Sequence, residues 1–318
     1  MARSSALQRK GDMARSRRWV VDDKSPRDLA GVVAAMGCEP EAIAHGRVFI
    51  GRKRATDAAR RMRGGEVVEV FLATAPESKP AAILLGRRGG MVAMLKPAGM
   101  PTVPDHRGST GSLQAAVAEL EGLRDPDAVH PSSRLDLEVS GVVVFALDSK
   151  ARTLLREARE QGSYTRHYVA ISQQAPAPAQ GLIELPIGRA PDPRRRCVGG
   201  KDPAASTTHY RVAAKTDRGA LLAVEPITGR THQIRVHLAH LGAPLLGDAL
   251  YGGPRTIVQA SGAVTSMSRV ALHAAWVRIG LGDGETWTVQ APVPGELESL
   301  WQSVGGSAAD WEDALRRR

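Results

Sequence analysis

Short apolar runs alternate with helical patterns over most of the chain. The apolar run 142–145 predicts a buried strand, and Asp148-Ser149 directly after it predicts the cap of a helix that continues to about residue 159. Strands and helices are mixed from about residue 82 onward, and no internal repeat is visible. Further elements are predicted at residues 168–171 (strand), 221–227 (strand) and 231–241 (helix).

A smaller pattern precedes these elements. Ser25-Pro26 predicts the start of a helix and Gly46 the end of a second one, while the runs 48–50 and 67–71 predict two strands. The expected division is a basic disordered arm over 1–20, a small domain over 21–75, a linker over 76–84, a larger domain over 85–305 and a C-terminal tail over 306–318.

Composition excludes several classes of protein. Hydrophobic residues make up 42% of the chain, enough for a sizeable core, and no apolar run is long enough to cross a bilayer, so no membrane association is expected. Two cysteines cannot form a disulfide framework, and we expect a reducing cytoplasm. The chain has no glycine-rich phosphate loop, which argues against nucleotide hydrolysis.

Positive charge exceeds negative charge. The chain has 43 Lys and Arg against 33 Asp and Glu, a net charge of +10 that favours a polyanionic partner, usually nucleic acid. Aromatic residues make up only 4%, so phosphate contacts rather than base stacking are expected to carry most of the affinity. Three clusters can bind phosphates or simply be solvated: residues 1–18, residues 47–63, and residues 194–196 in a loop expected to be mobile.

Two segments are dense in polar groups. In residues 132–141, Arg134 and Asp136 stand directly before the apolar strand, as a loop ion pair or as part of a site. Asp136 and Glu138 are too close in sequence to flank a bond as a glycosidase pair would. In residues 228–240, Thr231 can cap the helix, and His232 and Arg235 lie on one face of it. The spacing of His232, His237 and His240 does not favour a metal site.

At these two segments the chain resembles the RluA-type family of RNA pseudouridine synthases. Residues 133–141 (SRLDLEVSG) correspond to the family motif His-Arg-Leu-Asp-x-x-Thr-Ser-Gly, with Ser133 and Val139 in place of His and Thr. Residues 228–253 (TGRTHQIRVHLAHLGAPLLGDALYGG) match a second motif more fully, and shorter matches lie at 96–99, 166–170, 272–274 and 291–294. Residues 46–50 and 65–70 more weakly resemble the ribosomal-protein-S-four-like RNA-binding domain, which would make residues 21–75 a small RNA-binding domain.

The resemblance implies an α+β catalytic domain with a mixed, largely antiparallel sheet, and the isomerisation of uridine to pseudouridine in RNA without a cofactor or metal. Asp136 matches the carboxylate that acts near the anomeric carbon, either by covalent attack or by abstracting a proton. Arg235 would pair with Asp136 and orient it, and Tyr168 would pack against the uracil and could take the carbon-5 proton. Arg134 could fill the space left by the flipped nucleotide.

The other predicted RNA-binding residues are Arg230, His232, Gln233, Arg47, Arg52, Lys53 and Arg54. Structured RNA is the expected partner, ribosomal RNA first and transfer RNA as the alternative, and the protein is expected to be a monomer. A non-catalytic RNA-binding protein that retains the fold is the alternative function. Ser133 and Val139 favour that alternative, because each lost hydrogen bond typically costs about 1 kcal/mol, but the three matched site residues favour the enzyme.

Overall fold

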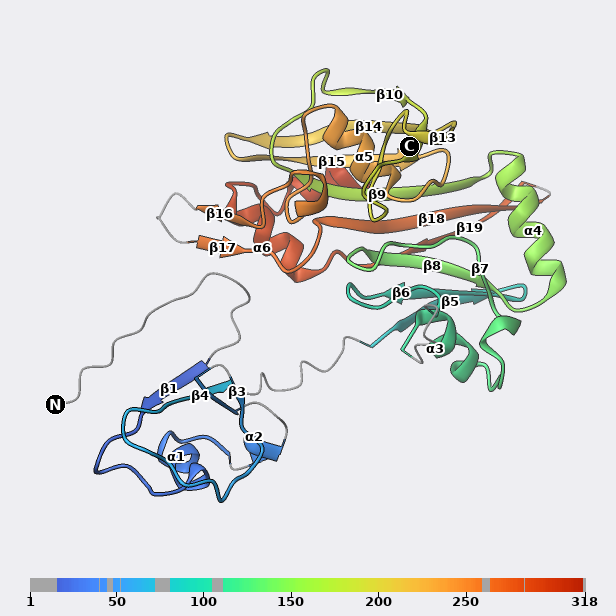
Figure 1. Ribbon diagram of the computed structural model, residues 1–318. Helices are drawn as coiled ribbons and strands as arrows, with labels where there is room; N and C mark the ends of the chain where they lie inside the picture. Colours follow the sequence, from blue (N-terminus) through green and yellow to red (C-terminus); the bar gives the residue numbers. More distant parts are fainter. Residues whose placement is uncertain are drawn as a thin grey trace. The chain divides into compact units, whose positions relative to one another are not determined.

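The computed structural model describes residues 16–39, 41–44, 48–51, 53–71, 81–104, 111–258, 264–282 and 284–316. The chain divides into two compact units, Met1–Lys79 and Pro80–Arg318, which are described separately here (Figure 1).

The described part of the first unit is a small antiparallel sheet packed against two helices. The strand order is β1-β4-β2-β3. The buried side chains of Leu29, Val32 and Val33 share one core with those of Val48 and Val68. The elements are β1 (Ser16–Val20), α1 (Leu29–Ala35), α2 (Glu41–Ala44), β2 (Val48–Ile50), β3 (Lys53–Arg54) and β4 (Val67–Phe71).

Two predictions for this unit are wrong. Residues 16–20 are not part of a disordered arm, because β1 pairs with β4 and Trp19 packs against the core. Residues 1–15 lie outside the described residues, as does Gly46. Helix α1 is capped by Asp28, whose carboxylate accepts a hydrogen bond from the Gly31 amide, and not by Ser25. The Ser25 hydroxyl instead bonds within the turn that begins at Asp22.

The second unit contains most of the chain's regular structure. Its strands are β5 (Ile83–Arg88), β6 (Met91–Lys96), β7 (His130–Pro131), β8 (Ser140–Ala146), β9 (Tyr164–Ser172), β10 (Gln180–Glu184), β11 (Ile187–Arg189), β12 (Arg196–Val198), β13 (Lys201–Ala204), β14 (Thr207–Thr216), β15 (Gly219–Pro226), β16 (Thr256–Val258), β17 (Val264–Ser266), β18 (Leu272–Gly282) and β19 (Glu285–Gln290). Its helices are α3 (Leu113–Leu120), α4 (Ser149–Glu160), α5 (Gln233–His240), α6 (Gly295–Ser303), α7 (Asp310–Leu315) and two short 3₁₀ helices, η1 (Pro126–Ala128) and η2 (Ala249–Tyr251).

One large sheet organises this unit. Figure 1 shows its strands side by side in the order β10-β14-β15-β9-β18-β8-β6-β5, with β19 paired to β18 and β7 to β8. Among the described residues, its strand pairs are antiparallel except β18 with β8, which pair at Ala274 and Gly141. The predicted α+β class with a mixed, largely antiparallel sheet is therefore confirmed.

Both faces of the sheet are covered, which explains the continuous apolar run at residues 142–145. Val143 and Phe145 face the core shared with α3 and α5, whereas Val142 and Val144 face the core shared with α4. A strand that is buried on both sides needs apolar residues at every position rather than at alternate ones. The predicted helix after it is confirmed as α4, with Asp148 as its N-cap.

The C-terminal residues do not form a separate tail. Helix α7 packs on strands β14, β15 and β9, and its Trp311 and Ala314 are buried. The Asp313 carboxylate pairs with Arg211, and the Ala314 carbonyl accepts from the His167 ring. The sequence did not predict α7, because Trp311 and Ala314 are its two buried positions and most of their neighbours are charged. In addition, residues 83–84 of the predicted linker already belong to β5.

Gly141 permits the close approach of β8 to β18, and its replacement tests this packing. Its φ is +129°, and a Cβ there would lie 2.3 Å from the Ala274 carbonyl oxygen. We expect Gly141→Ala to lower the free energy of unfolding by at least about 3 kcal/mol in urea denaturation. Gly122 also has positive φ, but nothing lies near its Cβ position, so Gly122→Ala should cost only about 1 kcal/mol. Equal losses would contradict the packing argument.

Candidate active site

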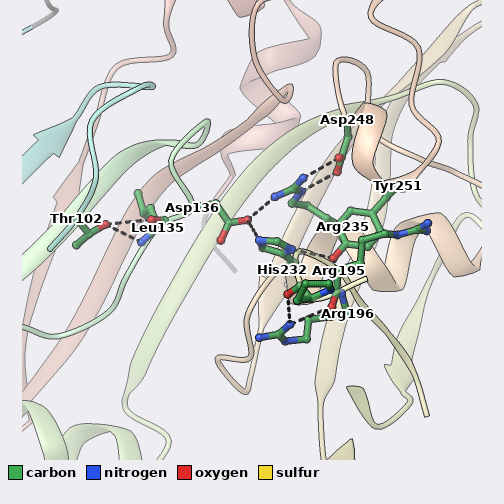
Figure 2. A network of polar contacts seen from close by, with 10 residues as sticks. Thr102, Leu135, Asp136, Arg195, Arg196, His232, Arg235, Asp248 and Tyr251 are labelled. Atoms are coloured by element: carbon green, nitrogen blue, oxygen red, sulfur yellow. Dashed lines mark hydrogen bonds and ion pairs between the residues drawn. The ribbon is translucent and has the colours of Figure 1, made fainter. Parts of the chain in front are cut away.

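A cleft of about 790 Å³ lies over the central strands of the large sheet. Its walls come from the loop before β8, from β9, and from the turn that joins β15 to α5. Seven residues predicted for the site line this cleft: Arg134, Asp136, Tyr168, Arg230, His232, Gln233 and Arg235. Figure 2 shows the polar network at its floor.

Asp136 stands on a loop that is held at both sides. The Thr102 hydroxyl donates to the Leu135 carbonyl and accepts from the Leu135 amide, at 3.0 and 3.1 Å. The side chains of Leu135 and Val139 are buried in the core on either side of the aspartate. The Asp136 side chain remains 23% exposed, so its carboxylate is both fixed and accessible from the cleft.

Arg235 of α5 joins two carboxylates. Its Nη1 donates to Asp136 Oδ2 at 2.9 Å, and its Nε and Nη2 donate to the two Asp248 oxygens, both at 2.7 Å. Arg235 is 5% exposed and Asp248 is fully buried. Burial alone would lower the pKa of Arg235, but the bonds to Asp248 and Asp136 outweigh it and raise that pKa. The predicted pair of Asp136 and Arg235 is thus brought together in the structure.

Sequence reasoning missed Asp248, the residue that fixes Arg235. It lies in the loop between α5 and β16, where Gly247 and Gly253 allow very close backbone packing. A Cβ on Gly247 would lie 1.9 Å from the Arg269 carbonyl oxygen. The acid within the second motif was the available signal, because a buried carboxylate needs a cationic partner.

His232 lies beside Asp136, with its Nε2 at 3.9 Å from Asp136 Oδ2. Its Nδ1 is 2.7 Å from the Tyr251 hydroxyl, which sequence reasoning also missed. Burial lowers the pKa of His232, and the Arg235 cation lowers it further, against the attraction of Asp136. The backbone of His232 is left-handed, at φ 58°, so the predicted helix begins only at Gln233 and Thr231 does not cap it.

Gln233 lines the cleft and supports the turn before α5, and its RNA contact stays a prediction. Its side chain is buried, and its carbonyl oxygen accepts from the Arg230 amide and the Thr228 hydroxyl. Its amide nitrogen donates to Thr207 and Thr208 of β14. Both the carbonyl oxygen and the amide nitrogen of the Gln233 side chain are therefore hydrogen-bonded to groups of the protein itself.

Exposed arginines stand at the mouth of the cleft. Arg134 is exposed, and Arg230 is exposed with its Nε on the Ala205 carbonyl. Arg166, which was not predicted, braces the same turn by donating to the carbonyls of Pro226 and Thr228. The rim of the cleft is thus cationic.

Tyr168 of β9 also lines the cleft, and its side chain is almost fully buried. Burial raises the pKa of its phenol to about 12. The phenol therefore stays protonated at neutral pH, and its ring presents an apolar surface to whatever occupies the cleft.

Lys96, at the end of β6, is a buried cation within the short match at residues 96–99, and no role was predicted for it. Its Nζ donates to the carbonyls of Pro97, Met100 and Leu137, so each ammonium proton has an acceptor. Burial and the Arg269 charge lower its pKa to about 7, against the attraction of Asp136. Lys96 ties the loop after β6 to the loop that carries Asp136.

The other polar side chains singled out in the sequence have partners of their own in the structure. Glu138 pairs with Arg255 at 3.0 Å and is not among the residues that line the cleft, where a second glycosidase carboxylate would lie. His237 is buried against Thr208 and Leu185. Among the described residues, no group of three or more acidic, His or Cys side chains could hold a metal ion.

The predicted RNA-binding residues of the first unit are only partly described. Lys53 and Arg54 form β3 and are exposed, whereas Arg47 and Arg52 lie outside the described residues. No helix in the described part of the chain is long and apolar enough to cross a membrane.

The buried pair of Arg235 and Asp248 is expected to be a major source of stability at the site. Asp248→Asn keeps the side chain's shape but leaves the Arg235 charge short of a buried partner, which should lower the free energy of unfolding by about 3 kcal/mol. Glu138→Gln removes an exposed pair and should cost less than about 1 kcal/mol. Urea unfolding measures the loss in free energy for both variants. Equal losses would show that the buried pair stabilises the protein no more than the exposed pair does.

Comparison with known proteins identifies the family. Residues 90–240 match the family model described as RNA pseudouridylate synthase. The chain is 32% identical over 273 residues to "Ribosomal large subunit pseudouridine synthase D" of Xanthomonas campestris, covering 80% of this chain and 81% of that protein. It is 33% identical over 224 residues to "Dual-specificity RNA pseudouridine synthase RluA" of Salmonella typhi, covering 68% of this chain and 96% of that protein.

The fold gives the same answer. The structure resembles that of "Human RNA Pseudouridylate Synthase Domain Containing 1" with a TM-score of 0.56 and 25% identity, covering 77% of this chain and 98% of that one. The chain belongs to the RluA-type family of RNA pseudouridine synthases.

Proposed function

We propose that this pseudouridine synthase acts on ribosomal RNA and that Asp136 is the carboxylate that reacts with the target uridine. Two similar proteins, from Xanthomonas campestris and Nitrosomonas europaea, are named as ribosomal large subunit enzymes. The observation that carries the proposal is a cleft-facing Asp136 held by an arginine that is itself fixed by Asp248. An enzyme with that substrate would act in the cytoplasm; the monomeric state stays a prediction.

The reaction is an isomerisation in which the base–sugar nitrogen bond breaks, the base turns, and carbon 5 of the uracil joins the sugar. A carboxylate near the ribose can attack the anomeric carbon or abstract a proton, and a fixed, accessible Asp136 serves both routes. Arg235 orients the reacting oxygen, because its other two donors are held by Asp248. No oxidation or group transfer from another molecule is involved.

Tyr168 is proposed to pack against the uracil in the cleft. Its pKa of about 12 means that it remains a neutral phenol at physiological pH, which favours the packing role over the role of a base for the carbon-5 proton. The target nucleotide must leave its stack, which costs a few kcal/mol. Arg134 lines the cleft and is exposed, which supports the proposal that it fills the vacated space.

The first unit is proposed to assist RNA binding. Its exposed Lys53 and Arg54 lie together on β3, and the guanidinium of Arg54 lies 5.6 Å from the centre of the Phe49 ring. Such side chains contact phosphates without reading sequence.

Asp136→Asn tests the assigned reaction. Tritium release from an in vitro transcript of bacterial large-subunit ribosomal RNA, labelled at carbon 5 of uridine, should fall about a thousandfold or more, because asparagine can neither attack nor accept a proton. Glu138→Gln should retain activity. Full activity of Asp136→Asn would overturn the assignment, and free uracil as product would indicate a glycosidase. Release from transfer RNA but not from the ribosomal transcript would replace the proposed substrate.

Removing two charges from β3 tests the role of the first unit. The double variant Lys53→Ala, Arg54→Ala should weaken binding to the same transcript and reduce the slope of log affinity against log salt by about one to two. Lys24→Ala with Arg27→Ala removes two other exposed charges of the unit and should have a smaller effect. An unchanged salt slope in the β3 variant would rule out phosphate contact there.

A further inference from the structure

Strands β12, β11 and β13 form a small sheet outside the large one. We call this small sheet, residues 187–204, the basic arm; it is distinct from the N-terminal residues 1–20. It carries five cationic side chains against two carboxylates. A pocket of about 830 Å³ lies on it, lined by Arg189, Arg196 and Lys201 together with Pro191 and Pro193. The residues 194–196, expected to form a mobile loop, instead end the turn after β11 and begin β12.

The positive charge of the arm is not neutralised by its own acids. Asp192 pairs with Arg194 at 2.8 Å, and Asp202 lies 3.6 Å from Arg189. Within the described part of the chain, no carboxylate lies within ion-pair distance of Arg195, Arg196 or Lys201. Arg195 and Lys201 are also exposed, so these cations can meet the phosphates of a nucleic acid.

The arm is anchored to the elements that carry the active site. Ile187 and Val198 pack in one cluster with Val236 of α5 and Tyr251 of η2. A Cβ on Gly188 would lie 2.3 Å from the Gly199 carbonyl oxygen, so β11 and the turn after β12 are in close contact. A strand anchored in this way cannot shift without disturbing α5 or η2.

Tyr251 is the point where the arm meets the catalytic network. Figure 2 shows its hydroxyl between the arm and His232: the oxygen lies 2.9 Å from the Arg196 amide nitrogen and 2.7 Å from His232 Nδ1. The guanidinium groups of Arg195 and Arg235 lie 5.6 and 5.0 Å from the centre of its ring. One side chain therefore contacts the arm, the histidine and the catalytic arginine.

These hydrogen bonds favour one of the two neutral forms of His232, the one with its proton on Nε2. The Arg196 amide can only donate, so the Tyr251 oxygen accepts from it. That leaves the single hydroxyl proton free to be donated to His232 Nδ1, an arrangement that requires Nδ1 to be unprotonated. In this arrangement the proton of the neutral imidazole is on Nε2, the atom 3.9 Å from Asp136 Oδ2. That gap is too long for a direct hydrogen bond, so the Nε2–H is available to an oxygen of the nucleotide.

We propose that the basic arm binds phosphates of the RNA strand beside the cleft, and that Tyr251 links the arm to the active site by holding His232 with its proton on Nε2. This inference rests on the proposed function, because it assigns the arm and His232 to the same RNA substrate. Tyr251 acts as a positioning residue, and His232 donates to the bound nucleotide.

The first experiment tests the arm. Arg195→Ala with Lys201→Ala should weaken filter binding of the large-subunit ribosomal transcript about fivefold to tenfold and reduce its salt slope by about one to two. Arg87→Ala with Arg88→Ala removes the same charge from β5, at the other edge of the large sheet, and should change neither. RNA should also protect Cys197, which lines the arm's pocket, from alkylation. Unchanged affinity and no protection would overturn the arm's assignment.

The second experiment tests Tyr251. Tyr251→Phe keeps the ring but removes the hydroxyl, so kcat for tritium release should fall at least about tenfold while RNA affinity and salt slope stay unchanged. The ¹⁵N spectrum of histidine-labelled wild type should show His232, assigned with a His232→Gln variant, with its proton on Nε2, and Tyr251→Phe should shift it to a mixture of tautomers. A proton on Nδ1 in the wild type, or an unchanged spectrum in the variant, would overturn the link.

The two proposals fail in different ways. If the wild type releases no tritium from the ribosomal transcript, the proposed substrate is wrong, but the binding, protection and ¹⁵N measurements still decide the role of the arm and of Tyr251. If the wild type is active and the arm variant binds normally, the arm alone is wrong.

Discussion

The site depends on one buried guanidinium placed between two carboxylates. Arg235 is almost completely buried, and a buried charge is stable only when its partners are close and well oriented. Asp248 takes two of its donors in the interior, which leaves one fixed donor for the exposed carboxylate of Asp136. An accessible aspartate is thereby given a fixed orientation without being buried itself.

The large sheet brings these groups together from distant parts of the chain. Asp136 precedes β8, Arg235 follows β15, and Tyr168 lies on β9, while β18 pairs with both β9 and β8. Gly141 permits the close pairing of β8 with β18, directly after the loop that carries Asp136. Lys96, at the end of β6, and Thr102, in the loop after it, add polar contacts, so the position of the aspartate is determined from several sides.

Charge and apolar surface are separated around the cleft. The floor contains the Asp136 network and the ring of Tyr168, whereas the rim carries exposed arginines. This arrangement agrees with a chain that has many cations and few aromatic residues, in which phosphate contacts are expected to carry most of the affinity for RNA. The basic arm adds further cationic side chains, and Tyr251 is its contact with His232.

Elements with local signals, and residues within recognisable motifs, could be predicted without coordinates. The buried run of β8 and the Asp148 cap of α4 could be predicted from patterns of a few residues, whereas the pairing of Arg235 with Asp136 was predicted from the family resemblance. Tertiary structure decided the rest, because those features depend on contacts between distant segments. β1 forms only by pairing with β4, α7 is held by the sheet, and Gln233 turns inward because β14 offers it partners. Asp248 becomes the support of the site only when its loop packs beside α5, which no local pattern encodes.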